Sequence, residues 1–390
     1  MGEKTKKEVL KRGGKLLSAY VSQTNFVQGL DSFQIDMDTL NAAKMSEELF
    51  PVVPYEKWSR NGKSVDISVG YKNVPYINRL TQEKALCAEA EKWAKKQSGS
   101  EKITVFVYNM HTAFMQAACS VKKVRPDAKL ILIVPDLPQF MDYKMGTVKK
   151  VLKDLDWQRI KGCMKHFDKY VLYARPMAKF LKLKKETWTV IEGSFDPDII
   201  GRPAEDVGDK VSIMYSGILD LRYGIPELLD AMNLLDGHYE LWITGTGNAE
   251  GLIMQRAETD ARIKYFGYFP SRQDLLDIQA SATMLISTRK KSEAGSNYCF
   301  PSKIFEYMVS GRPVISCYLG GIPKEYQEFL LELEDVTPSL IAKAVQKIAG
   351  MDKAEQDEIG RKGKEFILNE KNKFKQAEKL LRFANDSGDI

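Results

Sequence analysis

Short apolar runs rich in β-branched residues alternate along the chain with segments whose apolar residues recur at helical spacing. The runs are mostly apolar on both faces, as strands are in a parallel sheet covered on both sides. Such alternation predicts doubly wound α/β sheets. The expected helices include Thr112–Val124, Pro226–Leu235, Ser271–Ala280 and Lys303–Ser310. The expected strands are Lys15–Val21, Ser64–Gly70, Ile103–Tyr108, Lys129–Val134, Tyr170–Tyr173, Thr187–Ile191, Val211–Tyr215, Glu240–Thr244, Ile263–Phe266, Thr283–Ile286 and Pro313–Cys317.

The alternation breaks near Gly193–Lys210, where glycine, proline and acidic residues occupy turn positions and a new βα series follows. We therefore expect two Rossmann-like domains that face a cleft, residues 1–195 and 196–370. The charged segment from Lys353 to Ala384 indicates a long terminal helix, and residues 371–390 are expected to pack toward the N-terminal domain. Ligands of open α/β sheets bind at the carboxyl ends of strands, so a ligand site is expected in the cleft.

The composition is typical of a folded globular protein. Of 390 residues, 44% are hydrophobic and 28% charged, which excludes wholesale disorder. No apolar run is long enough to span a membrane, and the Lys-rich first residues do not form a secretory signal. The five cysteines are scattered and none forms a C-x-x-C pair, so a reduced, cytoplasmic location is expected.

Several common enzyme classes are disfavoured by the absence of their motifs. The sequence has no P-loop and no G-x-S-x-G elbow, and its Gly245–Gly251 stretch has one residue too many for a dinucleotide fingerprint. Three histidines lie far apart, and the D-x-D triplets are of a kind common by chance, so no metal site is expected.

Two glycine-rich turns follow consecutive predicted strands. One leads from Gly217 into a helix, and the other is Gly245-Thr246-Gly247. Both would lie at the carboxyl edge of one sheet, where backbone N–H groups suit a phosphate. Ordinary tight βα turns are the alternative interpretation.

The segment after Thr288-Arg289 carries the strongest signal. A loop ends at Pro301-Ser302, where a helix is expected to begin, and Lys303 and Glu306 are three apart on one face of that helix. Because the helix is otherwise largely apolar, Glu306 should be buried and should need a partner, and a pair of ribose hydroxyls would serve. The alternative is a solvated Lys/Glu pair that supports the helix.

The stretch Phe-Pro-Ser-Lys-Ile-Phe-Glu-Tyr-Met-Val-Ser-Gly-Arg-Pro-Val-Ile at 300–315 resembles the donor-site signature of the family 4 retaining glycosyltransferases, which have the GT-B fold. It is most similar to the bacterial surface-polysaccharide branch. Ser287-Thr-Arg289 resembles that branch's N-P-R turn, and Val134-Pro-Asp136-Leu-Pro also looks like this branch. The resemblance covers Val211 to about Tyr326 well and the first half only by its order of elements.

The resemblance implies a donor site for a nucleotide sugar. Glu306 would bind the nucleotide ribose, and Gly217, Gly245 and Gly247 would lie under the nucleotide and diphosphate. The family's diphosphate-binding Arg and Lys correspond here to Ile218 and Tyr223. The cations expected to meet the leaving diphosphate instead are, in order, Lys303, Arg289 and Arg222.

Further departures affect the sugar contact. The family's paired glutamates are eight residues apart, and the position eight before Glu306 is Tyr298, which we include in the expected donor site with Ser302. Glu293 is an alternative carboxylate for the sugar, or else an ordinary solvated loop acid. In the first half, His111 and Asp136 follow strands and are expected at the cleft with catalytic or sugar-contacting roles, alongside Lys303. A plain cap or packing role is the alternative for His111.

The resemblance, taken with these residues, implies a retaining, metal-independent hexosyltransferase without a cofactor. It would move a hexose or N-acetylhexosamine from a nucleotide sugar, most simply a UDP-sugar, to a glycan or lipid-linked acceptor in polysaccharide biosynthesis. Positioning and charge stabilisation would supply the catalysis, and domain closure would exclude water. The alternatives are an inactive glycosyltransferase-like partner subunit, suggested by the losses at the diphosphate site, and a sugar-nucleotide epimerase.

Most of the net charge sits in one window. The formal charge is +6, and residues 144–169 hold eight basic and three acidic residues, a local charge of 8 − 3 = +5. The window predicts an amphipathic basic helix, with a break at Gly162 as one option. Nucleic acid is not expected as a partner because no binding module accompanies the charge. Lys149, Lys150, Lys153 and Trp157 would hold the acceptor domain on an anionic inner leaflet; a core-facing helix with a solvated basic face is the alternative.

Overall fold

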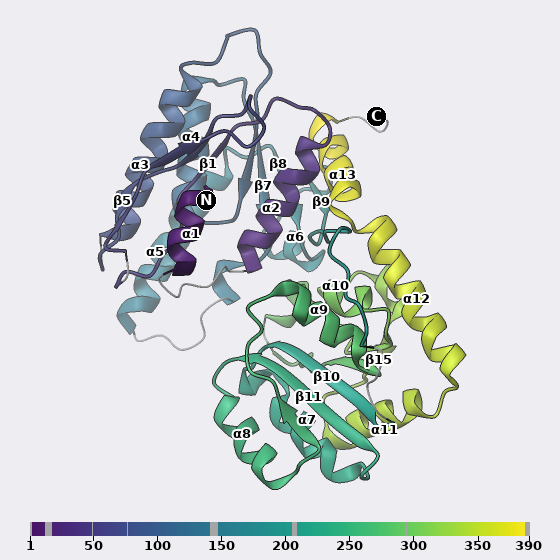
Figure 1. Cartoon of the computed structure of the whole chain (residues 1–390). Coiled ribbons are helices and arrows are strands. Elements are labelled where there is room, and N and C mark those ends of the chain that lie inside the picture. Colours follow the sequence, from purple (N-terminus) through teal and green to yellow (C-terminus); the bar gives the residue numbers. More distant parts are fainter. Residues whose placement is uncertain are drawn as a thin grey trace. The chain divides into compact units, whose positions relative to one another are not determined.

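The structure, a computed structural model, describes residues 2–11, 18–48, 50–75, 77–140, 147–204, 209–293 and 295–386. The chain divides into two compact units (Figure 1). Unit 1 comprises Met1–Tyr173, Ala178–Ile191 and Ala377–Ile390, and unit 2 comprises Ala174–Met177 and Glu192–Gln376. The chain therefore returns to unit 1 through helix α13 (Lys373–Asn385), as predicted for the C-terminal helix.

A four-stranded parallel sheet forms the centre of unit 1, in the order β6-β7-β8-β9. Residues 130–134 of the second strand are almost completely buried, which explains their unbroken apolar sequence. The strands are β6 (Thr104–Tyr108), β7 (Lys129–Val134), β8 (Lys169–Leu172) and β9 (Trp188–Val190). The helices that alternate with them are α3 (Asn78–Ala94), α4 (Thr112–Val124), α5 (Thr147–Met164) and α6 (Pro176–Phe180). Helix α5 continues through Gly162 without the break that the sequence allowed.

The first part of unit 1 differs from the sequence-based expectation. The predicted strand Lys15–Val21 is wrong where it is described, because α2 (Ser18–Asp31) is helical there, after α1 (Glu3–Lys11). Two small sheets then form, β1-β4-β3 and β2-β5, and both include antiparallel pairs. Their strands are β1 (Thr39–Asn41), β2 (Val52–Val53), β3 (Glu56–Trp58), β4 (Asp66–Ser68) and β5 (Tyr71–Lys72).

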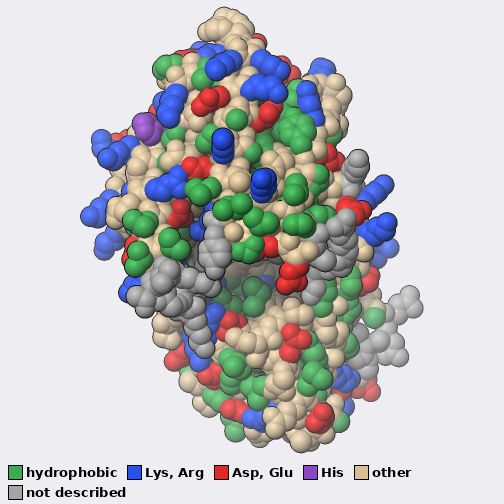
Figure 2. Space-filling view, turned by 90° about the vertical axis from the view of Figure 1, so that its left-hand side faces the viewer, with side chains coloured by type: hydrophobic (Ala, Val, Ile, Leu, Met, Phe, Trp, Pro, Cys, Tyr) green, Lys and Arg blue, Asp and Glu red, His purple; other side chains and the backbone are tan. Residues whose placement is uncertain are grey.

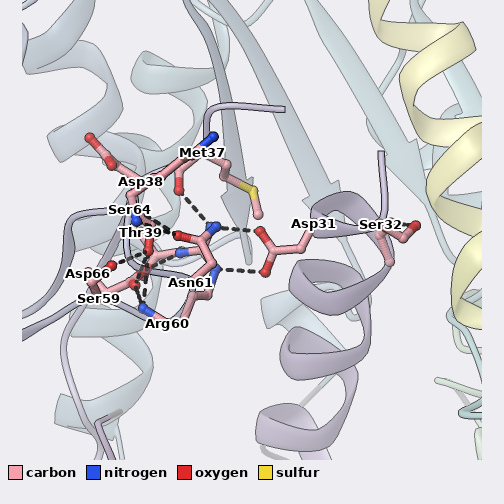
Figure 3. A network of polar contacts seen from close by, with 12 residues as sticks. Asp31, Ser32, Met37, Asp38, Thr39, Ser59, Arg60, Asn61, Ser64 and Asp66 are labelled. Atoms are coloured by element: carbon pink, nitrogen blue, oxygen red, sulfur yellow. Dashed lines mark hydrogen bonds and ion pairs between the residues drawn. The ribbon is translucent and has the colours of Figure 1, made fainter. Parts of the chain in front are cut away.

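A buried polar network joins the end of α2 to the β1-β4-β3 sheet (Figure 3). Arg60 donates to the two carboxylate oxygens of Asp31 at 2.8 and 3.0 Å and also pairs with Asp66. Asp66 is fully buried and accepts from the hydroxyls of Thr39 and Ser64 at 2.6 and 2.7 Å. Several donors thus satisfy a carboxylate that would be costly to bury alone.

Unit 2 contains a six-stranded parallel sheet in the order β12-β11-β10-β13-β14-β15. The chain begins in the middle with β10, builds outward to β12, and then returns to the other side of β10 with β13. The order of connection reverses between β10 and β13, and this switch point is where open α/β sheets bind ligands. The strands are β10 (Val211–Ile218), β11 (Tyr239–Thr246), β12 (Ile263–Tyr265), β13 (Met284–Ser287), β14 (Val314–Ser316) and β15 (Leu331–Glu332).

Helices alternate with these strands, so the predicted α/β class with two parallel sheets is confirmed. The predicted single terminal helix is instead two helices, because the chain leaves helical geometry at Lys371 and starts again at Lys373. The helices of unit 2 are α7 (Ile225–Ala231), α8 (Glu250–Thr259), α9 (Arg272–Ser281), α10 (Lys303–Val309), α11 (Pro338–Ala349) and α12 (Lys353–Glu370).

The break between α12 and α13 pairs with the segment that enters unit 2 from β9. Phe195 N donates to Lys371 O at 2.9 Å, and Lys373 N donates to Phe195 O at 2.8 Å. Beside this bridge, the buried Lys371 Nζ donates to Glu192 Oε1 at 2.5 Å, and Tyr326 Oη donates to the same oxygen at 2.6 Å. These contacts therefore join the segment after β9 to the residues between α12 and α13, all within unit 2.

Candidate functional site

The two glycine turns predicted from the sequence pack directly against each other. Strands β10 and β11 pair in parallel with Gly217 opposite Gly245, and both glycines have positive φ, +121° and +134°. A Cβ on Gly245 would lie 1.8 Å from Gly217 O, and a Cβ on Gly247 would lie 2.1 Å from Leu219 O. Glycine is therefore required here by close backbone approach as well as by conformation.

Tyr307 fixes helix α10 beside the Gly217 turn. Its buried hydroxyl donates to Ser216 O at 2.9 Å and accepts from Ser216 N at 2.8 Å. Because Ser216 immediately precedes Gly217, this pair of hydrogen bonds holds α10 at the end of β10. Lys303 and Glu306 belong to the same helix, so the sequence signal at 300–315 and the glycine turn meet at one place.

The ammonium group of Lys303 lies over the Gly217 turn. Nζ is 3.9 Å from the centroid of the Tyr215 ring, and a Cβ added to Gly217 would be 3.6 Å from Nζ. Burial, with a contribution from the nearby Arg289, lowers the pKa of Lys303 to about 7, which Glu306 only partly opposes. An anion placed here would therefore meet a cation that is incompletely neutralised and poorly hydrated.

Glu306 faces a cation that sequence reasoning missed. Arg272 Nη2, from the start of α9, lies 3.7 Å from Glu306 Oε1. Burial raises the pKa of Glu306, while Arg272 and Lys303 oppose the rise. Among the described residues we find no hydrogen-bond donor to this carboxylate, which leaves its oxygens available to hydroxyl groups of a ligand. No pattern in the sequence pointed to Arg272, because its proximity depends on how α9 packs beside α10.

Arg289 follows β13 at the switch point and is held by its own loop. Its Nε lies 3.1 Å from Ser296 Oγ and 3.3 Å from Glu293 Oε2, and its Cζ lies 5.1 Å from the centroid of the Tyr223 ring. Glu293 is not a solvated loop acid, since its side chain is 10% exposed and its Oε1 is buried without a hydrogen-bond partner. Nη1 of the same guanidinium also donates to Cys299 Sγ at 3.3 Å.

The other predicted donor-site residues are Arg222, Ser302 and Tyr298. Arg222 turns toward Asp220, with Nη2 and Oδ2 2.7 Å apart, and its side chain is 45% exposed. Ser302 is the N-cap position of α10 but makes no side-chain capping bond, and it is exposed. Tyr298 is half-buried in the loop between β13 and α10. The structure thus places Lys303 beside Gly217, within electrostatic reach of Arg289 and Glu306, and places Arg222 in a local ion pair.

His111 and Asp136 belong to unit 1 and follow neighbouring parallel strands, β6 and β7, at the same sheet edge. Burial lowers the pKa of His111; Asp156 opposes the shift, whereas Arg79 adds to it. The Nδ1 atom of His111 is buried without a hydrogen-bond partner. The charge of Asp136 contributes to the raised pKa of Tyr108, which is mainly due to burial.

The predicted membrane-facing residues have different environments. Lys149 is in α5, but its side chain lies outside the described residues, as does Lys144. Lys150 is exposed, and Lys153 Nζ donates to Gln139 O at 3.3 Å. Trp157 is half-buried with its ring 6.4 Å from that of Phe180, so it packs within unit 1.

The described residues contain no group of three or more His, Cys, Asp or Glu side chains that could hold a metal ion. Nor do they include a helix with the length and apolar character needed to cross a bilayer.

Residues 210–350 match the family model described as "Glycosyl transferases group 1". The matched segment contains the paired glycine turns, Arg289, Lys303 and Glu306. This match supports the resemblance that the 300–315 motif indicated. No curated protein matches the sequence.

Solved glycosyltransferase structures share the fold. Sucrose-phosphate synthase from Thermosynechococcus elongatus is 17% identical with a TM-score of 0.68, covering 94% of this chain and 92% of its own. A UDP-forming α,α-trehalose-phosphate synthase from Burkholderia xenovorans is 12% identical with a TM-score of 0.67, covering 93% and 97%. HepE of Anabaena, in complex with UDP, is 13% identical with a TM-score of 0.61, covering 81% and 85%. These structures confirm the predicted GT-B-like fold, and the match of residues 210–350 to the group 1 model supports the predicted resemblance to glycosyltransferases.

Proposed function

We propose that this protein transfers a hexose or N-acetylhexosamine from a UDP-sugar with retention of configuration, because residues 210–350 match the group 1 glycosyl transferase model. The acceptor is a glycan or a lipid-linked sugar in polysaccharide biosynthesis. One observation carries the proposal: the Lys303 ammonium lies over the Gly217 turn, on the same first turn of α10 as the unbonded Glu306 carboxylate. HepE, which is similar in fold, was solved with UDP, which supports the choice of nucleotide.

In this proposal each unit 2 residue has one task. The Glu306 carboxylate accepts hydrogen bonds from the ribose hydroxyls of the donor. Lys303 and Arg289 stabilise the negative charge that develops on the departing diphosphate, because both lie at the switch point of the sheet. Gly217 leaves the space beside the Lys303 ammonium open to a diphosphate, since a Cβ there would lie 3.6 Å from Nζ, and Gly245 allows the two turns to pack against each other.

His111 and Asp136 are proposed to act on the sugar and the acceptor from unit 1. Burial favours the neutral form of His111, in which one ring nitrogen accepts a hydrogen bond and the other donates. A neutral imidazole can contact a sugar hydroxyl without adding a positive charge. A phosphate oxygen of the leaving group is proposed to take the proton of the acceptor hydroxyl.

Binding and turnover together test the proposal. UDP and UDP-sugars should raise the melting temperature of the full chain more than GDP does, because a ligand stabilises the state that binds it. Glu306→Ala and Lys303→Ala should abolish both the shift and the slow hydrolysis of the sugar donor. Glu258→Ala, at an exposed position of α8, is the control and should retain both. No response to any sugar nucleotide would refute the proposed reaction.

An inactive partner subunit is the second candidate. Ile218, where the family has a diphosphate-binding arginine, is 65% exposed and offers no charge. The sequence also has Tyr223 in place of the family's lysine. Binding of UDP without hydrolysis or transfer, unchanged by any acceptor, would favour this role over catalysis.

A further inference from the structure

The first half of helix α5 exposes its large apolar side chains. Val151, Leu152 and Leu155 are 54%, 56% and 58% exposed. One interpretation of the sequence assigned these residues to the core, because they share helical spacing with Ile160. The structure corrects that assignment: Ile160 and Cys163 are buried, whereas the three residues near the start of the helix face solvent.

Neighbouring elements of unit 1 expose apolar side chains as well. Helices α5 and α3 are joined by Arg159 Nη2 and Glu83 Oε1, 2.5 Å apart. Ile77, which precedes α3, and Leu80 in its first turn are both exposed. Strand β5 lies beside the start of α3, since Thr81 Oγ1 donates to Lys72 O at 2.7 Å, and it pairs with β2. Beyond these, Val52 of β2 and the nearby Tyr55 are 63% and 52% exposed.

Together these residues define what we call the α3–α5 face: Val52, Tyr55, Ile77, Leu80, Val151, Leu152 and Leu155. Figure 2 shows hydrophobic side chains on this side of unit 1, with Lys, Arg, Asp and Glu side chains among them. Single exposed apolar residues are ordinary on protein surfaces. Apolar side chains collected from two helices and a strand pair are typical of a surface that meets a membrane or a partner.

The charges around the face are mainly positive. Exposed cations on its elements are Lys72, Arg79, Lys84 and Lys150, and the exposed acid Glu47 lies beside the start of α3, where it accepts from Asn78 Nδ2 at 2.6 Å. On α5, Asp154 is an exposed acid, whereas on α3 Glu83 is half-buried and paired with Arg159. Apolar side chains flanked by lysine and arginine match the two layers of an anionic leaflet, its acyl region and its phosphate headgroups.

We propose that the α3–α5 face docks on an anionic phospholipid bilayer, with Val151, Leu152 and Leu155 entering the boundary between headgroups and acyl chains. The surrounding lysines and arginines bind the lipid phosphates. Hydrophobic insertion by α5, and not charge alone, then provides the attachment. This inference goes beyond the proposed reaction and depends only on the surface of unit 1.

Vesicle flotation with the full chain tests the proposal. Wild-type protein should float with vesicles of phosphatidylcholine and phosphatidylglycerol in equal parts, and much less with phosphatidylcholine alone. Leu152→Ser/Leu155→Ser should lower the partition coefficient about tenfold, because each leucine loses part of its transfer free energy. Leu234→Ser, which replaces a leucine of unit 2 that is 53% exposed, should leave the partition coefficient unchanged.

A UDP thermal shift and the elution volume of each variant separate the possible failures. The double variant should keep the wild-type response to UDP. That result would show that the variant is folded and that donor binding does not depend on the α3–α5 face. The proposal is overturned if wild-type protein does not float, or if the double variant floats as well as wild type. It is also overturned if the double substitution converts a dimer into a monomer without changing flotation, since the face would then bind a second copy of the chain.

Discussion

The guanidinium of Arg272 and the carboxylate of Glu306 lie 3.7 Å apart on two different helices of unit 2. Arg272 also lies over Phe195, with its Cζ 5.2 Å from the ring centroid. Phe195 forms a parallel β-bridge with Asn372, the residue before α13. The proposed ribose-binding carboxylate is therefore oriented by a cation that rests on the connecting segment.

Removal of Arg272 should weaken nucleoside binding and shift its pH dependence. Burial raises the pKa of Glu306 and Arg272 opposes that rise, so Arg272→Met should raise the pKa of Glu306 further. Uridine affinity should fall about fivefold at neutral pH, equivalent to about 1 kcal/mol. The loss of affinity on acidification should begin at a higher pH than in wild type, as measured by calorimetric titration.

Two variants define the cause of that effect. Arg272→Lys should recover part of the affinity and of the pH profile, because it restores a charge without the planar guanidinium. Arg256→Met removes another arginine of unit 2, paired with Asp230, and should not change uridine binding. An equal loss in Arg256→Met, or an unchanged pH profile in Arg272→Met, would contradict a positioning role.

Binding of UDP should become weaker as pH rises through neutrality. The pKa of Lys303 in the empty protein is about 7, and a diphosphate favours the charged form, so binding takes up a proton. Well above the pKa the protonated fraction falls about tenfold per pH unit, and UDP affinity should follow it. Calorimetry in buffers of different ionisation enthalpy would measure the proton directly.

Uridine and the variant Lys303→Met are the controls for this pH dependence. Uridine has no diphosphate, so its affinity should not show this alkaline decline. Lys303→Met should bind UDP more weakly at pH 6 and lose most of the decline. If UDP affinity is constant from pH 6 to 9 in wild type, the charge on Lys303 does not contribute to binding.

Gly245 should not tolerate any side chain. Its φ of +134° is strained for other residues, and a Cβ would lie 1.8 Å from Gly217 O. Gly245→Ala should therefore destabilise unit 2 by at least about 2 kcal/mol and abolish the thermal shift by UDP. Gly251→Ala is the control: it lies on α8 with nothing near its Cβ, and should stabilise the protein by about 0.5–1 kcal/mol.

Lys371 should be essential for the stability of unit 2. Its side chain is 4% exposed and that of its partner Glu192 is 1% exposed, so Lys371→Met would leave a buried carboxylate without its cation. The expected loss is about 3–5 kcal/mol, detected as faster hydrogen exchange of unit 2 amides. Adding Glu192→Gln should recover part of the loss. Lys362→Met breaks an exposed pair on α12 and should cost less than about 1 kcal/mol.

Strong local patterns predicted much of the fold. Strand β7 and helix α4 have the predicted bounds, because a buried apolar run and a regular 3.6-residue pattern are each sufficient to define them. Lys15–Val21 shows the limit, since a short apolar run is compatible with either a strand or a helix, and α2 takes the second form. Strands of two or three residues, such as β2 and β5, depend on pairing with distant segments and leave little local signal.

The candidate site was predictable where the chain itself carries a motif. Glu306, Lys303 and the paired glycines belong to short segments with recognisable spacing. Arg272 does not, because only the packing of α9 brings it to Glu306. The outward orientation of Leu152 and Leu155 was likewise beyond the sequence, since an apolar residue at helical spacing is assigned to the core unless the neighbouring elements are known.

The bridge between Phe195 and Lys371 has a consequence for recombining this protein with its relatives. A donor-binding module cut after α12 would discard the strand partner of Phe195 and the cation of Glu192. A chimera that exchanges donor specificity would therefore have to carry residues 371–376 along with 192–370, although the following turns of α13 belong to the other unit. The boundary of the donor-binding module therefore falls inside α13 and not at the start of that helix.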